Sequence, residues 1–186
     1  LYADLNDCND DEYLKRADIF LGQWQWENAY ILLNEYIEKN SKDGNKGSKD
    51  GCLEKAEFLR ALASYKTIEM PYDMELLDEE ELAPIFQSLN DAESLFQTAL
   101  LRWPDSEYKP FALASLGLIH RDLNNIAFSE GYFAMVGDNY PDYTGMAEVI
   151  YHIAKYFDDK GYTEKAQELY QRVFEKYPES SHALTP

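Results

Sequence analysis

Three times in this chain an aromatic residue, a proline and an acid follow one another: Trp103-Pro104-Asp105, Tyr140-Pro141-Asp142 and Tyr177-Pro178-Glu179. Each copy begins 37 residues after the one before it. Upstream positions keep the same interval, with a small residue, an aromatic one and a small apolar one in each copy. They are Ala92, Phe96 and Ala99, then Ser129, Phe133 and Val136, then Ala166, Tyr170 and Val173. A pattern repeated in register predicts one structural unit stacked several times.

Apolar residues recur at helical spacing through most of the chain, which predicts helices almost throughout. The expected helices are 11–22, one carrying Ala29 to Ile37, 53–70, 84–102, 107–122, 126–139, 145–159 and 163–177. Turn residues separate them, with Asn124-Asn125 and Gly161 inside the last two pairs. We expect one domain, 1–186, with hairpins at 11–40, 53–104, 107–141 and 145–178. The tail from Ser180 to Pro186 is expected to fray.

Two polar segments interrupt the helices. Residues 41–51 are glycine-rich and without periodicity, which predicts a flexible loop, and they lack the ligand spacing of a calcium loop. Residues 71–84 form an acidic insert that begins at Pro71. We interpret it as a solvated loop that Met74, Leu76 and Leu77 hold to the helices. The alternative is a docking element for a basic partner. Its acids are Asp73, Glu75, Asp78, Glu79, Glu80 and Glu81.

The last two units resemble the tetratricopeptide repeat. The first reads Leu113-x-x-Leu116-Gly117-x-x-His120, then Ser129, Phe133 and Pro141; the second reads Ile150-x-x-Ile153-Ala154-x-x-Phe157, then Ala166, Tyr170 and Pro178. Gly117 and Ala154 would let the two helices of a hairpin approach closely. The resemblance implies an all-α, right-handed superhelical solenoid of about four antiparallel hairpins.

A narrower resemblance is carried by Trp103-Pro104-Asp105-Ser106 and Tyr177-Pro178-Glu179-Ser180. These strings look like bacterial extracytoplasmic members of the family, such as the lipoprotein of the outer-membrane β-barrel assembly machinery. The likeness favours a periplasmic or outer-membrane-associated protein in an envelope assembly, with a cytoplasmic location as the alternative. Because the chain begins at Leu1, a removed signal peptide or lipid anchor would not be seen.

The resemblance also implies a concave groove lined by the first helix of each hairpin. The groove residues transferred by alignment are Leu14, Asp18, Leu59, Ala63, Lys66, Phe111, Ala114, Leu118, Arg121, Glu148, Tyr151, Lys155 and Asp158. The functional interpretation is a site for a peptide or a partner helix. The alternative is that each of them is an ordinary exposed helix residue.

Charge limits the classes of partner. Asp and Glu number 35 against 17 Lys and Arg, so the formal net charge is −18. Such a surface repels nucleic acid and anionic lipid and favours a protein or peptide partner, including a basic one. No stretch approaches the ~20 apolar residues that a membrane-spanning helix needs.

Cys8 and Cys52 each lie just before the first helix of a hairpin. In a stacked solenoid those helices run side by side, so the two thiols could form a disulfide. An oxidising compartment would favour the bridge and a reducing cytosol would favour free thiols.

No constellation typical of catalysis is found. His120, His152 and His182 show no metal-ligand spacing with either cysteine, and we expect no metal and no cofactor. His120 is expected to pack between helices, and His152 to face solvent or a neighbouring turn. We therefore expect a non-enzymatic protein–protein interaction scaffold. The alternative is a structural module that self-assembles by stacking its ends, and the oligomeric state is left open.

Overall fold

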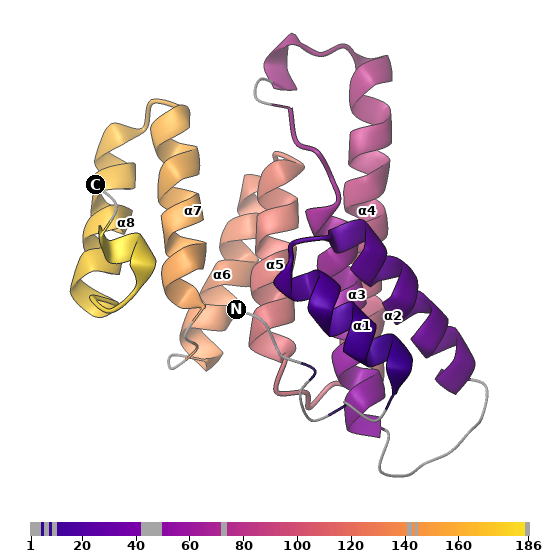
Figure 1. Cartoon of the computed structure of the whole chain (residues 1–186). Helices are drawn as coiled ribbons and strands as arrows, with labels where there is room; N and C mark the ends of the chain where they lie inside the picture. Colours follow the sequence, from indigo (N-terminus) through magenta and orange to yellow (C-terminus); the bar gives the residue numbers. More distant parts are fainter. Residues whose placement is uncertain are drawn as a thin grey trace.

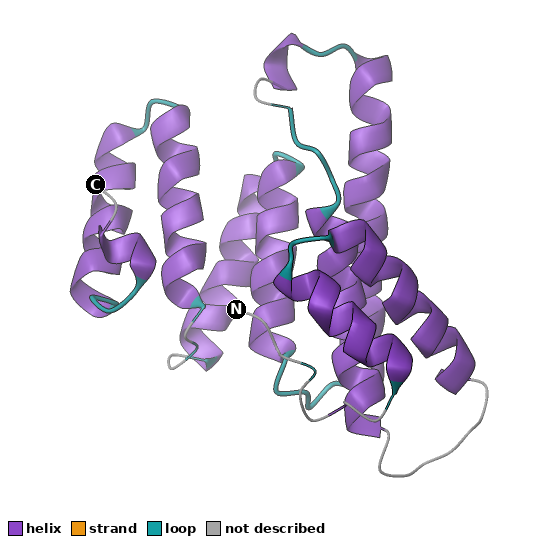
Figure 2. Cartoon of the chain, in the orientation of Figure 1, coloured by secondary structure: helices purple, strands orange, loops and turns teal. Residues whose placement is uncertain are grey.

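The chain folds into a row of helices (Figure 1). The computed structural model describes residues 5, 8, 11–41, 50–71, 74–140, 143 and 145–184. The helices are α1 (Glu12–Gly22), α2 (Trp26–Ser41), α3 (Asp50–Lys66), α4 (Glu79–Arg102), α5 (Lys109–Asp122), α6 (Ile126–Asn139), α7 (Met146–Asp159) and α8 (Thr163–Lys176). Short 3₁₀ helices are also found at η2 (Met74–Leu76) and η3 (Ser181–Leu184). Within these ranges no strand is found (Figure 2), which confirms the all-α prediction.

The helices pair as four antiparallel hairpins, and each helix packs against the next one along the chain. The first helices of successive hairpins also meet, since α3 contacts α5 and α5 contacts α7. Figure 1 shows α1 and α2 at one end of the row and α7 and α8 at the other. This arrangement is a helical-repeat solenoid, as the periodicity and the resemblance predicted.

The repeated aromatic residue of the motif ends the second helix of each of the last three hairpins. Trp103, Tyr140 and Tyr177 adopt nearly the same conformation, with φ between −125° and −135° and ψ between 53° and 66°. In each case the backbone N–H donates to the carbonyl four residues earlier at 2.9 Å. A residue before proline is disfavoured in the α region, so the following proline accounts for the helix end. Pro141 itself lies outside the described residues.

Trp103 has a further role that its counterparts do not share. Its indole Nε1–H donates to Glu57 Oε2 at 2.6 Å, and Arg102 Nη1 donates to Glu57 Oε1. Glu57 is buried on α3, so both bonds satisfy a carboxylate that would be costly to bury alone. These bonds join α3 to the C-terminal end of α4.

The turns inside the last two hairpins need a left-handed residue. Asn124 has φ 59° and Gly161 has φ 79°, so the two turn signals in the sequence are confirmed. At each of these turns the next residue's N–H donates to the carbonyl five residues earlier, from Asn125 to His120 and from Tyr162 to Phe157. The same turn geometry therefore recurs in α5–α6 and α7–α8.

In the third hairpin, α5 and α6 approach closely at Gly117, which has no side chain. A Cβ at Gly117 would lie 2.5 Å from Phe133 Cε1, so the aromatic ring fills the space that glycine leaves. Ser129 Oγ donates to the carbonyl oxygen of Gly117 at 2.8 Å and closes the same contact. The close approach predicted at Gly117 is confirmed. Ala154 and Ala166, at the matching positions of the fourth hairpin, are fully buried.

The apolar core runs the length of the row in two clusters. One is built mainly from α1 to α5, and the other from α5 to α8. Leu100, Leu118 and Tyr132 pack against both clusters, so α4, α5 and α6 join them. Each hairpin covers the apolar side of its neighbour, as stacked repeats require.

The insert between α3 and α4 differs in three respects from what we expected. Helix α3 ends at Lys66 rather than near Met70. Helix α4 begins at Glu79, ahead of Pro84, because Asp78 and Glu81 form a capping box. Leu76 is 81% exposed and so does not hold the insert to the helices, whereas Met74 and Leu77 are partly buried. The N-terminal part of α4 and η2 project beyond the neighbouring helices (Figure 1).

The C-terminal tail is ordered where fraying was expected. Residues Ser181–Leu184 form η3, which contacts both α7 and α8. The Ala183 side chain packs against the second apolar cluster, and Ser180 N–H donates to the Tyr177 carbonyl at 2.9 Å. The expectation of fraying was therefore wrong for 180–184. Thr185 and Pro186 lie outside the described residues, as do 42–49 of the glycine-rich loop.

We predict that Gly117→Ala destabilises the fold by about 1–3 kcal/mol, because the new methyl group must displace the Phe133 ring. Gly131→Ala is the matched control in α6: nothing lies within 4 Å of its Cβ position, so it should stabilise by about 0.5–1 kcal/mol. Urea unfolding followed by circular dichroism measures both. Equal effects of the two substitutions would contradict the close contact.

Candidate functional site

A cavity of about 270 Å³ opens between α3, α5 and α7, and we call it the central cavity. Aromatic and aliphatic side chains make most of its wall, with a few polar groups among them, as in ligand and peptide sites generally. The residues lining it are Trp24, Leu62, Tyr65, Lys66, Phe111, Ala114, Ser115, Leu118, Tyr143, Glu148, Val149 and His182. They come from all four hairpins and from η3.

Five of the residues transferred by alignment line this cavity together. They are Lys66, Phe111, Ala114, Leu118 and Glu148. Of the others on α5 and α7, Arg121 and Tyr151 are partly buried, and Lys155 and Asp158 are exposed. The first helices of the second, third and fourth hairpins therefore contribute to one continuous surface.

At the N-terminal end of the row the same alignment fails. Leu14 and Leu59 are 1% exposed and Ala63 is fully buried, so none of them can contact a partner. The physical reason is that the first two hairpins are covered by their neighbours and by Leu5, which lies ahead of α1. Leu5 is itself fully buried and belongs to the same apolar cluster as Leu14 and Leu59.

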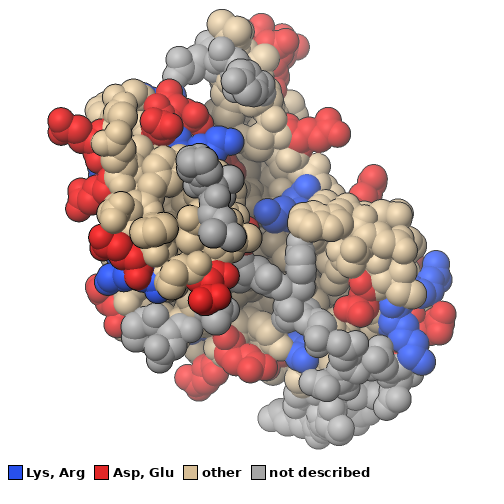
Figure 3. Space-filling view, turned by 60° about the vertical axis from the view of Figure 1, so that its left-hand side comes forward, with Lys and Arg blue, Asp and Glu red and all other residues tan. Residues whose placement is uncertain are grey.

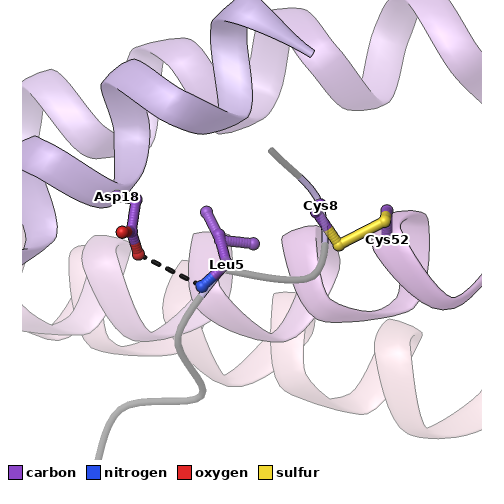
Figure 4. The surroundings of a disulfide bond; sticks show 4 residues. All are labelled: Leu5, Cys8, Asp18 and Cys52. Carbon is purple, nitrogen blue, oxygen red and sulfur yellow. Dashed lines mark hydrogen bonds between the residues drawn. A yellow bond between two sulfur atoms is a disulfide. The ribbon is translucent and has the colours of Figure 1, made fainter. Parts of the chain in front are cut away.

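The N-terminal residues are fixed to the helices at two described points (Figure 4). Leu5 N–H donates to Asp18 Oδ1 at 3.1 Å, so this predicted groove residue binds the chain's own backbone. Cys8 and Cys52 form a disulfide with a Cα–Cα distance of 5.7 Å. Cys52 lies inside the first turn of α3 rather than ahead of it. A cross-link that closes a loop of this length contributes about 4 kcal/mol in the chain-entropy model.

A buried polar group forms part of the cavity wall. Tyr65 OH on α3 donates to Asp122 Oδ2 on α5 at 2.6 Å, and Arg121 Nη2 lies 2.6 Å from Asp122 Oδ1. Burial and the neighbouring Asp122 carboxylate raise the pKa of Tyr65, so the phenol stays protonated and donating. The three groups hold the ends of α3 and α5 together beside the cavity.

An aromatic group covers the C-terminal side of the cavity. The Tyr151 ring lies 4.9 Å from the His182 ring and 5.7 Å from Tyr170, measured between centroids. His152 lies 6.2 Å from His182. We expected His152 to face solvent or a neighbouring turn; its side chain is 35% exposed and it faces η3.

Burial and the neighbouring cations Arg121, Lys66 and Lys155 together lower the pKa of His152 to about 4, with burial as the largest cause. Glu148 Oε1 lies 3.8 Å from His152 Nε2 and favours the protonated ring, but burial and the cations outweigh it. His152 is therefore neutral at physiological pH.

His120 packs between helices, as predicted. Its ring stacks between Phe128 and Tyr132 of α6, with centroid distances of 5.3 and 5.4 Å. Nε2 lies 3.3 Å from Glu93 Oε1 of α4. The histidine therefore fills the position where this unit departs from the usual repeat pattern.

Two acidic residues of the insert cap the N-terminus of α4. Asp78 Oδ1 accepts from Glu81 N–H at 3.0 Å, and Glu81 Oε2 accepts from Asp78 N–H at 3.1 Å. Both residues are exposed, as are Glu79 and Glu80. Asp73 and the Glu75 side chain lie outside the described residues.

The described residues show neither a metal-binding cluster nor a membrane-spanning helix. No group of three or more His, Cys, Asp or Glu side chains is placed to hold a metal ion. Of the helices described, none combines the length and apolar character that would let it cross a membrane.

A comparison with known families finds a match in the last hairpin. Residues 148–180 match the tetratricopeptide repeat. The match covers most of α7 and all of α8, and α5 and α6 have the same length as α7 and α8, 14 residues each. No curated protein matches the chain. The repeat indicates a scaffold for protein–protein interaction.

Seven residues of the cavity wall were not predicted from the sequence: Trp24, Leu62, Tyr65, Ser115, Tyr143, Val149 and His182. Tyr65 directly precedes a predicted groove residue, Lys66. His182 lies in the tail that was expected to fray. Trp24 is in the first hairpin turn at φ 60°, and no motif marks it.

We predict that His152 makes the fold less stable in mild acid. The unfolded ring takes up a proton near pH 6.5 and the folded ring only near pH 4, so stability falls as the pH drops from about 6.5 to 4. Because the side chain is partly exposed, we expect on the order of 1 kcal/mol between pH 7 and pH 5. Urea unfolding of the wild type and His152→Gln at both pH values measures this difference. Equal losses in both proteins would show that His152 does not contribute.

Proposed function

We propose that this protein is a non-enzymatic scaffold that holds a segment of a partner protein in the central cavity and along the adjoining faces of α5 and α7. The single observation that carries the proposal is that one cavity takes side chains from successive repeat units. A partner segment lying across it would contact several hairpins at once. The volume suits one or two apolar side chains of a partner, which are the usual anchors of such contacts.

The proposed mechanism is rigid display. The wall residue Tyr65 is fixed by Asp122, and the wall residue Phe111 packs edge-to-face on Phe96 at 6.0 Å. Side chains already held in place lose little conformational entropy on binding, which leaves more of the contact energy for affinity. At the N-terminal end the predicted groove residues Leu14, Leu59 and Ala63 are buried, so we place the partner at the C-terminal end.

We predict that Leu118→Ala combined with Tyr151→Ala weakens partner binding at least tenfold without changing helicity. Leu118 lines the cavity and Tyr151 lies beside it, so both truncations remove apolar contact area from the proposed site. The measurement is affinity capture from cells of the source organism, followed by calorimetric titration of the captured protein.

The matched control is Met135→Ala combined with Phe174→Ala, two exposed residues on α6 and α8 that do not line the cavity. A partner captured by the wild type and the control but lost from the cavity variant would support the proposal. Capture of the same proteins by all three would overturn it, provided that circular dichroism shows equal helicity.

We also propose that the protein works in an oxidising compartment, as a component of a bacterial envelope assembly. The support is the Cys8–Cys52 disulfide, since such bridges persist mainly outside the reducing cytosol. The envelope assembly itself rests on the resemblance of the aromatic–proline–acid strings to extracytoplasmic members of the family.

We predict that the protein isolated from its own cells with thiols blocked during lysis carries no alkylated cysteine. After reduction, intact mass should rise by two alkyl groups, one each on Cys8 and Cys52, because the chain has two cysteines in all. A double Cys→Ser variant, which gains neither group, is the control. Two groups added without reductant would place the protein in a reducing compartment.

A further inference from the structure

The outward side of α6 carries large apolar side chains that remain exposed. Phe128 is 65% exposed and Met135 is 47% exposed. The small residues Ala127, Gly131 and Ala134 lie next to them at helical spacing and are exposed as well. We call these five residues the α6 face. None of them lines the central cavity, so the α6 face is separate from the proposed partner site.

The α6 face also lies on the least charged of the α-helices described. Helix α6 has two charged residues, Glu130 and Asp138, and Glu130 is paired with Lys165 of α8 at 2.8 Å. Helix α8 has the same length and six charged residues, Glu164, Lys165, Glu168, Arg172, Glu175 and Lys176.

Charge elsewhere on the molecule opposes contact between two copies. The formal net charge is −18. Figure 3 shows Asp and Glu side chains spread over the face of the molecule that it draws. Two copies therefore repel each other over much of their surface, and the α6 face is a place where they can meet at low electrostatic cost.

Gly131, at the centre of the α6 face, makes no close contact inside the chain. Nothing lies within 4 Å of the position that its Cβ would take, whereas Phe133 fills that space at Gly117. Its φ is not positive, so no left-handed conformation requires a glycine there. Glycine inside a helix lowers its stability relative to alanine. What Gly131 provides is bare backbone in an apolar surface, which a second helix can approach closely.

The α6 face is complementary to itself. A two-fold axis through Gly131, with the two helices antiparallel, brings together residues that lie equally far from Gly131 on opposite sides. Three residues away, Phe128 meets Ala134 of the second copy. Four residues away, Met135 meets Ala127 of the second copy. Each large side chain therefore meets a small one, which is how closely packed helices interdigitate.

We propose that two copies of this chain associate through the α6 face, antiparallel about a two-fold axis at Gly131. This inference goes beyond the proposed function and does not depend on it. The contact lies on the side of the row of helices rather than at its ends. Because no α6 residue lines the central cavity, both cavities of the dimer stay open, and the dimer can hold two partner segments at once.

The size of the surface sets the strength of the dimer. One helix face is much smaller than the roughly 800 Å² per partner that a standard interface buries, so we expect a reversible dimer with a dissociation constant on the order of 100 μM. Such a dimer is dissociated at the concentrations of a capture experiment, so Met135 stays suitable as a control residue for cavity binding.

The first measurement is sedimentation equilibrium of the whole protein, from about 10 μM to 1 mM. We expect a monomer–dimer equilibrium that strengthens at least threefold when salt rises from about 0.05 to 0.5 M, because salt screens the repulsion between the two acidic copies. A protein that stays monomeric up to about 1 mM at both salt concentrations overturns the proposal.

A charge placed on the α6 face locates the contact. Ala134→Lys should weaken the dimer at least tenfold, because the ammonium group would lie against Phe128 of the second copy. Ala83→Lys is the matched control, since Ala83 is an exposed alanine on α4 and the net charge changes equally. It should change the dissociation constant less than twofold. Equal effects of the two substitutions would show that the copies meet through another surface and would overturn the proposal.

An exchange of two residues tests the pairing itself. Ala127→Met alone sets two methionines against each other and should weaken the dimer about fivefold. Ala127→Met combined with Met135→Ala restores one large and one small residue at each contact, so its dissociation constant should return to within about twofold of the wild type. Both positions are exposed, so the monomer should remain folded. An exchanged variant that is no better than Ala127→Met would overturn the pairing about Gly131.

Gly131→Ala separates the dimer from the stability of the single chain. We expect this substitution to stabilise the monomer, since its Cβ meets open space, and to weaken the dimer at least threefold, since the two new methyl groups meet at the axis. Urea unfolding at low concentration and sedimentation equilibrium measure the two effects on the same protein. A dimer as strong as that of the wild type would contradict the close approach of the two helices and overturn the proposal.

Discussion

The contact between the Phe133 ring and the bare Cα of Gly117 sets how closely α5 and α6 approach. The bond from Ser129 to the Gly117 carbonyl fixes the same contact from the other side. Because α5 touches α3, α4 and α7 as well as α6, its position determines where both neighbouring hairpins lie. The central cavity is bounded by α3, α5 and α7, so its shape depends on this one close approach.

The two ends of the row of helices differ in how terminal residues pack on them. At the N-terminal end, Leu5 is buried in the first apolar cluster and the disulfide joins Cys8 to α3. At the C-terminal end, η3 places His182 against Tyr151 and borders the cavity without filling it. The central cavity therefore lies over the later hairpins. Leu5 and the disulfide stabilise the N-terminal end, whereas the cavity beside η3 remains open.

Sequence reasoning succeeded where the cause is local. The prolines at 104 and 178 force the residue before them out of the helix, and Asn124 and Gly161 accept a left-handed turn, so helix ends there could be read from residue type. It failed at α4, where the effect of Pro84 was overestimated and the capping box of Asp78 and Glu81 was overlooked. It also failed at Leu14 and Leu59, because alignment to a repeat cannot reveal that residues from outside the repeat cover them.

The sequence by itself determined that the chain is a stack of helical hairpins, because period, small-residue positions and helix-ending prolines act within a few residues of one another. Only the tertiary structure decided which part of the concave face is open. That outcome depends on Leu5 reaching Asp18, Tyr65 reaching Asp122 and His182 reaching Tyr151, contacts between residues 13, 57 and 31 positions apart.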